Sequence, residues 1–189
     1  MRRAHRSTIS RGFTLIELMI TLLIVSVGML GLAKLQAAAI AESSVSRTRS
    51  LMTFQAESLS GMMQSNRGYW AVTTGTLPNF SVGTVATPVT DNAGTLDTTT
   101  TTDCTTSSCT PARVAGFDVN AWAGDLLKQF PTASGGVVCT NASVLPNTLL
   151  PTSCDITLRW AEHYVAINKT ATDAAASTGT SSMVLHVQP

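Results

Sequence analysis

The hydrophobic pattern begins with a long apolar run near the start of the chain. From Phe13 to Ala33 the sequence carries a single charged residue, Glu17. A helix of about 21 residues rises about 31 Å, which is close to the thickness of the hydrocarbon core of a membrane. The pattern therefore predicts a membrane-spanning helix over 13–33, with a carboxylate near its beginning.

The helical pattern continues beyond the apolar run. No proline occurs between Met1 and Tyr69, and the segment 34–66 is rich in good helix formers. An apolar stripe at spacings of three and four residues runs through it, formed by Met52, Ala56, Leu59 and Met63. We expect one helix over 13–66, about 80 Å long. Its second half should pack on a globular domain, and Gly68 should end it.

The rest of the chain alternates between loop and regular patterns. Residues 71–112 are rich in Thr, Gly, Ser and Pro, which predicts mostly loop. A helix is expected from Asp118, as its N-cap, to Phe130, with Pro131 stopping it. Apolar residues that can share one face of this helix are Phe117, Trp122, Leu126, Leu127 and Phe130.

Three strands are expected after that helix. Gly135-Gly136 predicts a turn, followed by strands at 137–140, 155–162 and 183–188. In the second strand, Ile156, Leu158 and Trp160 alternate with more polar residues. We therefore expect an α+β fold, in which a long N-terminal transmembrane helix packs on a C-terminal antiparallel β-sheet domain over 67–189.

The charge of the chain is unevenly distributed. Of its 12 basic residues, Arg2, Arg3, Arg6 and Arg11 all precede Gly12. Arginines on this side of an apolar helix keep that end cytoplasmic. Without these four, the chain has eight basic and 11 acidic residues. A mildly acidic body is a poor general phosphate binder, so nucleic acid is an unfavoured partner.

The four cysteines, Cys104, Cys109, Cys139 and Cys154, all lie in the distal half. An even number in a chain with an export-type N-terminus indicates disulfides in an oxidising compartment. For Cys104 and Cys109, a local disulfide loop is favoured over a metal site because no histidine lies nearby. A Cys139–Cys154 disulfide would close a loop of about 16 residues and stabilise the fold by about 3 kcal/mol. The sequence leaves the pairing open.

Three interpretations of the N-terminus compete. A secretory signal peptide would use the alanine-rich segment 37–41 for cleavage, but the apolar run is too long and carries a carboxylate. A plain membrane anchor leaves Glu17 unexplained, because an unpartnered ionised group in lipid costs several kcal/mol. The third interpretation, a cleaved prepilin, follows from a specific motif.

The motif is Arg11-Gly12-Phe13-Thr14-Leu15-Ile16-Glu17. It closely resembles the prepilin peptidase site of the type IV pilin family. The resemblance implies cleavage after Gly12 and N-methylation of the new N-terminal Phe13, with residues 1–12 as the leader peptide. It also implies that Glu17 serves subunit assembly.

The position of Glu17 fits that role physically. Cleavage would expose an ammonium group at Phe13, one helical turn from Glu17 and near the positive end of the helix dipole. In a bundle of such helices, Glu17 of one subunit can neutralise the amine of a neighbour. An unmatched charge is costly at low dielectric, so this pair can set the register between subunits.

The distal half resembles the minor pilins known as type IV pilus modification proteins, PilV. The similar features are the helix around 118–130, the Gly135-Gly136 turn, the strand at 156–160 and a C-terminal strand. The segment Gly28-Met-Leu-Gly-Leu-Ala-Lys-Leu-Gln36 shares this likeness. This resemblance implies a role in pilus assembly, with effects on adhesion or twitching motility.

Motifs of enzymes are absent from the sequence. It contains no Walker loop, nucleophile elbow, dinucleotide fingerprint or zinc-protease motif. Beyond the leader, the only histidines are His163 and His186, on expected strands. We therefore expect neither enzymatic activity nor a cofactor or metal.

The expected function is that of a minor pilin of a type IV pilus. The expected partners are prepilin peptidase, other major and minor pilins, the inner-membrane assembly platform and membrane lipid. The chain would sit in the inner membrane with a periplasmic domain before assembly, and in the cell-surface pilus afterwards. The alternatives are a minor pseudopilin of a type II secretion system and a pilus-tip module that binds a surface or DNA, the latter through Arg113, Lys128 and Arg159.

Overall fold

The computed structural model describes residues 12–98, 103–141, 143–145, 148–149, 151–163 and 178–189. It divides into two compact units, residues 1–43 and 44–189. Helix α1 (Leu15–Ser65) contributes to both units. The first unit consists, in its described part, of the short segment 12–14 and the apolar half of α1. All other elements lie in the second unit.

The second unit contains a five-stranded antiparallel sheet in the order β2-β1-β3-β6-β7. Its strands are β1 (Asn79–Val82), β2 (Val89–Asp91), β3 (Ser134–Thr140), β6 (Ser153–His163) and β7 (Thr178–Val187). The helices are α2 (Arg67–Trp70) and α3 (Pro111–Gln129). A separate two-stranded sheet is formed by β4 (Ser143–Leu145) and β5 (Thr148–Leu149).

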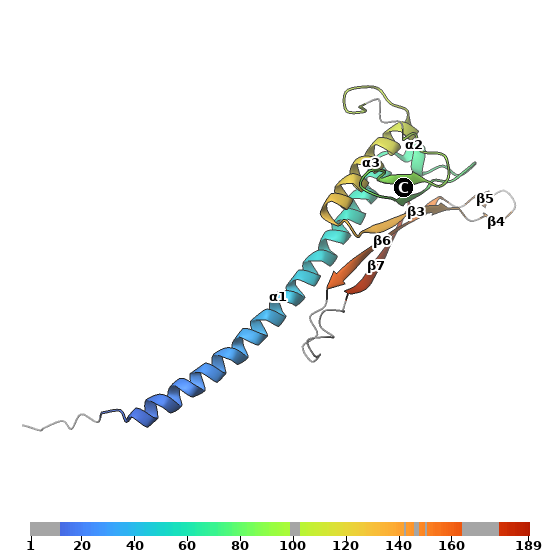
Figure 1. Ribbon diagram of the computed structural model, residues 1–189. Coiled ribbons are helices and arrows are strands. Elements are labelled where there is room, and N and C mark those ends of the chain that lie inside the picture. Colours follow the sequence, from blue (N-terminus) through green and yellow to red (C-terminus); the bar gives the residue numbers. More distant parts are fainter. Residues whose placement is uncertain (1–11, 99–102, 142, 146–147, 150, 164–177) are drawn as a thin grey trace, which may run out of the picture. The chain divides into compact units, whose positions relative to one another are not determined.

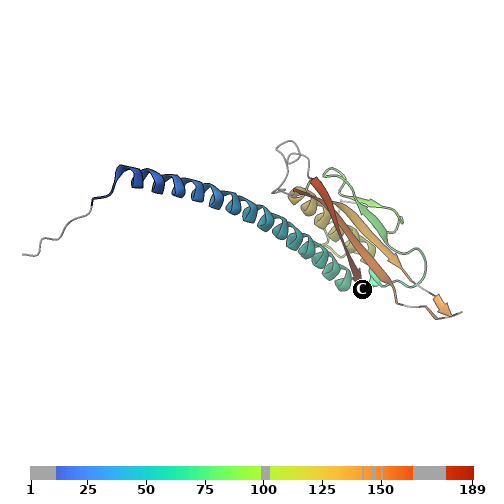
Figure 2. The same cartoon turned by 90° about the horizontal axis from the view of Figure 1, so that it is seen from below.

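Residues 44–65 of α1 pack with α3 against one face of the five-stranded sheet (Figures 1 and 2). The predicted stripe is confirmed, since Met52, Ala56, Leu59 and Met63 are all 0% exposed. The indole Nε1 of Trp122 on α3 donates a hydrogen bond to the carbonyl of Gln55 on α1. This contact fixes the two helices to each other above a single core.

The inward face of the sheet follows strict alternation. Its buried residues are Phe80 and Val82 on β1, Val137 and Cys139 on β3, Cys154, Ile156, Leu158 and Trp160 on β6, and Val187 on β7. The helix stripe and this face bury apolar area together, which is the main force holding the unit. The expected α+β, pilin-like architecture of a long N-terminal helix and an antiparallel sheet is confirmed.

Helix α3 begins earlier than the sequence predicted. It starts at Pro111, with Thr110 in the N-cap position, so Asp118 lies within the helix and is not its cap. Proline is well suited to the first turn of a helix because its missing N–H would be unpaired there anyway. The end was predicted well, since the C-cap is Phe130. Of the expected face, Phe117 and Phe130 are only partly buried.

The expected turn at Gly135-Gly136 is wrong, because both glycines lie within β3. A Cβ on Gly136 would come within 2.2 Å of the carbonyl oxygen of Phe80, and one on Gly135 within 2.0 Å of that of Thr157. The neighbouring strands approach too closely here for any side chain. The two glycines therefore allow the backbones of neighbouring strands to pack closely against β3.

The other boundaries differ in smaller ways. The segment 71–112 is mostly loop as expected, but it contains the short strands β1 and β2. Strands β6 and β7 extend further toward the connection between them than the sequence predicted. Helix α1 ends at Ser65, three residues before Gly68, and Gly68 lies in α2. Most of the threonine run at 98–102 lies outside the described residues.

Candidate assembly site

The segment that carries the processing motif leads directly into α1. Gly12, Phe13 and Thr14 precede the helix, and Arg11 lies outside the described residues. The backbone N–H of Glu17 donates to the carbonyl oxygen of Thr14 at 3.1 Å, and the hydroxyl of Thr14 lies 3.4 Å from the same nitrogen. Thr14 thus satisfies N–H groups that the first helical turn leaves unpaired. Glu17 lies in that first turn.

The Glu17 carboxylate is isolated among apolar side chains. Within the described part of the chain, no ion pair or side-chain hydrogen bond involves it. The nearest cation along the same helix, Lys34, is 17 residues away, or about 25 Å. A carboxylate placed in lipid therefore needs a positive partner from another molecule.

The first half of α1 is apolar on every side. Its large side chains are exposed over more than half of their surface from Leu15 to Leu35, and Phe13 is 85% exposed. This helix is long and apolar enough to cross a membrane by length and composition, a test that signal sequences pass as well. An apolar surface of this extent is stable only against lipid or other protein.

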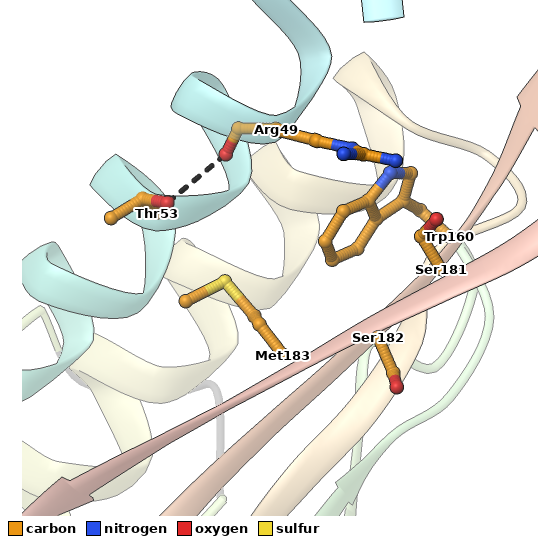
Figure 3. Close-up of a pocket in the computed structure, with 6 residues that line it drawn as sticks. All are labelled: Arg49, Thr53, Trp160, Ser181, Ser182 and Met183. Carbon is orange, nitrogen blue, oxygen red and sulfur yellow. Dashed lines mark hydrogen bonds between the residues drawn. The ribbon is translucent and has the colours of Figure 1, made fainter. Parts of the chain in front are cut away.

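A buried carboxylate ties α1 to the sheet in the second unit. Arg49 of α1 donates from Nε and Nη2 to the two carboxylate oxygens of Glu162 on β6, each at 2.9 Å. The indole Nε1 of Trp160 donates to Glu162 Oε1, also at 2.9 Å. The Glu162 side chain is 1% exposed, so these donors replace the water it has lost. Figure 3 shows Arg49 extending from α1 toward Trp160.

This cluster was missed from the sequence, although a signal for it exists. Glu162 follows Ile156, Leu158 and Trp160 at the same two-residue spacing, so it must lie on the buried face of β6. A carboxylate there demands a cation. What the sequence does not show is which basic residue supplies it, because Arg49 lies 113 residues away in the chain.

Both cysteine pairs form disulfides. Cys104 is joined to Cys109 in a local loop, and Cys139 to Cys154 across the adjacent strands β3 and β6. Cys139 and Cys154 are buried in the core, whereas the Cys104–Cys109 loop lies at the surface. In that loop the hydroxyl and backbone N–H of Thr105 donate to Asp103, which lowers the pKa of its carboxyl.

The basic residues considered for DNA binding do not form a patch. Arg113 and Lys128 lie at opposite ends of α3 and pair with Asp97 and Asp125, respectively. Arg159 lies on the outward face of β6. Since two of the three are paired with carboxylates, this set offers little positive potential to a phosphate backbone.

The histidines do not form a metal site with other residues in the part of the chain that the structure describes. His186 on β7 lies opposite Asp155 on β6, with Nδ1 2.5 Å from Oδ1. Both side chains are largely exposed, at 74% and 49%. His163 ends β6, and its side chain lies outside the described set.

These features define a pilin-like α+β protein with a single apolar N-terminal helix. Residues 8–33 match the family described as the prokaryotic N-terminal methylation motif. The match spans the expected cleavage site and Glu17, and it supports a protein of the type IV pilin or pseudopilin class. No curated protein and no solved structure matches the chain.

Proposed function

We propose that this protein is a minor pilin that is cleaved after Gly12, methylated on Phe13 and assembled into a type IV pilus. The observation that carries the proposal is the isolated carboxylate of Glu17, in the first turn of an apolar helix within the matched methylation motif. Prepilin peptidase and other pilins are the partners that such a motif implies.

In the assembled pilus, Glu17 pairs with the Phe13 ammonium group of a neighbouring subunit. Each charge alone is expensive in lipid, and pairing removes both penalties at once. The energetic difference between matched and mismatched registers then aligns adjacent helices. The apolar side chains around Glu17 supply the remaining contact area in the helix bundle.

Because the sequence of the distal half resembles that of PilV, we propose more specifically a PilV-like minor pilin. The proposed role includes a contribution to adhesion or twitching motility. A minor pseudopilin of a type II secretion system would use the same N-terminus. Neighbouring genes for pilus biogenesis favour the pilus, and a secretion gene cluster favours the alternative.

Mass spectrometry of the mature N-terminus tests the processing step. A chain that begins with methyl-Phe13 is the expected result. Retention of Met1, or a start near Ser43, would overturn the proposed processing.

The assembly role of Glu17 is tested by Glu17→Ala, with Glu42→Ala as the matched control on the exposed surface of the same helix. Glu17→Ala should be cleaved yet absent from sheared pili, whereas Glu42→Ala should be incorporated. Normal incorporation of Glu17→Ala would exclude the charge-pairing role.

A further inference from the structure

The outward face of the five-stranded sheet carries a hollow that extends over β1, β3 and β6. Its volume is about 450 Å³, which falls within the range of small-molecule sites, about 300–1,000 Å³. The outward-pointing residues that line it are Asn79 and Ser81 of β1, Ser134 and Val138 of β3, and Thr157 and Arg159 of β6. None of these residues belongs to the candidate assembly site or to the Arg49–Glu162 cluster.

Two glycines leave the floor of this hollow without side chains. Gly135 and Gly136 both line it, and Gly136 pairs with Ser81 of β1 on one side and with Thr157 of β6 on the other. Neighbouring strands lie about 4.8 Å apart, so about 10 Å separates the backbones of Ser81 and Thr157. The glycines that let the strands approach one another therefore also let a ligand reach the backbone between them.

Arg159 supplies a positive charge at the rim of the hollow. Its neighbours in register are two serines, Ser134 on β3 and Ser182 on β7. Asp155, on the same face of β6, lies against His186 and is about 13 Å from Arg159 along the strand. Within the part of the chain that the structure describes, no ion pair or side-chain hydrogen bond involves Arg159. Its exposed guanidinium can therefore receive a carboxylate through two parallel hydrogen bonds.

The rest of the rim offers neutral hydrogen-bonding groups. The hydroxyls of Ser81, Ser134 and Thr157 make no side-chain hydrogen bond to any described residue. The carboxamide of Asn92 donates to that of Asn79 at 3.3 Å, which leaves a donor on Asn79 and an acceptor on Asn92. Hydroxyls and carboxamides both donate and accept hydrogen bonds. The set therefore matches a ligand that carries several hydroxyl groups.

We propose that this hollow binds an acidic sugar, whose carboxylate pairs with Arg159 and whose ring lies over Gly135 and Gly136 with its hydroxyls on the neutral rim. A single cation among neutral groups suits one carboxylate, whereas a nucleic acid needs several cations. An apolar ligand would cover the polar groups of the rim without pairing them, which costs free energy. An acidic sugar pairs with both the charge and the hydroxyls.

The test is an NMR titration of the full chain in micelles of an uncharged detergent that has no sugar headgroup. Glucuronate is the probe. The controls are glucose, which lacks the carboxylate, propionate, which lacks the hydroxyls and resembles an acidic peptide side chain, and inorganic phosphate. Glucuronate should shift the amide signals of Gly136 and Thr157, and it should bind at least about tenfold more tightly than each control.

Two substitutions separate the carboxylate contact from the hydroxyl contacts. Arg159→Gln should weaken glucuronate binding by about tenfold, whereas Arg47→Gln, at an exposed arginine of α1, should leave it unchanged. Thr157→Val keeps the shape of the side chain and removes its hydroxyl. It should weaken glucuronate binding about fivefold without changing the affinity for propionate. Unchanged amide signals in α3 establish that each variant is folded.

Three results would overturn the proposal. Propionate binding as tightly as glucuronate would indicate an acidic peptide, equal binding of phosphate would indicate a general anion site, and full affinity in Arg159→Gln would exclude the carboxylate contact. Methyl glucuronoside, whose anomeric oxygen is capped as in a glycan, distinguishes the two sources of this ligand. Retained affinity indicates a sugar residue of a glycan, and lost affinity indicates a free sugar acid. None of these measurements depends on cleavage after Gly12 or on pilus assembly.

Discussion

The guanidinium of Arg49 and the carboxylate of Glu162 form a two-point contact between α1 and β6, with both N–O distances at 2.9 Å. The Arg49 side chain is 55% exposed, whereas that of Glu162 is 1% exposed. The contact therefore brings a cation from the protein surface to an anion inside it. Removing the cation leaves the anion buried, which costs more than the loss of an ordinary surface ion pair.

We predict that Arg49→Ala lowers the free energy of unfolding by about 3 kcal/mol, because Glu162 must then stay buried without its cation or take up a proton. Arg47→Ala, two residues before Arg49 in α1 and exposed, should change it by less than about 0.5 kcal/mol. Urea denaturation of the full chain in detergent micelles, followed by tryptophan fluorescence, measures both. Equal effects of the two variants would show that the contact adds little.

The apolar stripe of α1 leads to a second prediction. Leu59→Ala should destabilise the protein by about 2–5 kcal/mol, since Leu59 is 0% exposed and its removal leaves a cavity in the core. Phe54→Ala removes a larger side chain from the same helix, but one that is 65% exposed, and should cost less than about 0.5 kcal/mol. Thermal unfolding of both variants provides the comparison. A larger loss for Phe54→Ala would contradict the packing of α1 described above.

The sequence correctly predicted those helices and strands whose buried face follows from a regular spacing of apolar residues. The stripe from Met52 to Met63 and the alternation from Ile156 to Trp160 each follow from the geometry of a single helix or strand. Asp118 was misplaced because two signals competed, and Pro111 at the helix start outweighed it.

Features that depend on distant residues were harder to predict. Gly135 and Gly136 look like a turn until β1 and β6 are known to approach them on both sides. β1 itself has only four residues, and its strand conformation depends on pairing with β3. At the candidate assembly site, the motif predicts the processing and assembly residues Gly12, Phe13 and Glu17 from the sequence alone.

Replacing two of the glycines by alanine should change the free energy of unfolding in opposite directions. Gly136→Ala should destabilise the protein by about 2 kcal/mol, because its Cβ would meet the carbonyl oxygen of Phe80 at 2.2 Å. Gly61 lies within α1 with no atom near a built Cβ, so Gly61→Ala should stabilise the protein by about 0.5–1 kcal/mol. The denaturant midpoints of the two variants, compared with that of the parent protein, show the direction of each change in stability. Stabilisation by Gly136→Ala would rule out the close strand approach at β3.

The two disulfides should contribute differently to the free energy of unfolding. Removing the Cys139–Cys154 bond by a double serine substitution should cost about 3 kcal/mol, because it closes the longer loop. Removing Cys104–Cys109 should cost about 2 kcal/mol in the same entropic account, with no further loss from the core, since that loop lies at the surface. Unfolding of both double variants under non-reducing conditions tests the order. The reverse order would contradict a core role for the β3–β6 bridge.

Burial raises the pKa of Asp118 above its ordinary value of 3.8. The folded protein therefore binds a proton at this position more tightly than the unfolded chain does. By linkage, the favourable contribution of the protonated form is complete below pH 3.8 and is lost as the pH rises through the folded pKa. At neutral pH the charged carboxylate is thus a small net destabilisation.

Asp118→Asn should remove this dependence. We expect a gain in the free energy of unfolding of a few tenths of a kcal/mol at pH 7, kept small because the side chain is only partly buried and water screens the charge. The gain should vanish near pH 3, where the parent carboxyl is protonated. Glu57→Gln, on the exposed surface of α1, controls for the general loss of a negative charge. Denaturation of the parent and both variants at pH 3 and pH 7 measures the difference. An equal gain in the free energy of unfolding at both pH values would assign the effect of Asp118→Asn to helix propensity rather than to the buried charge.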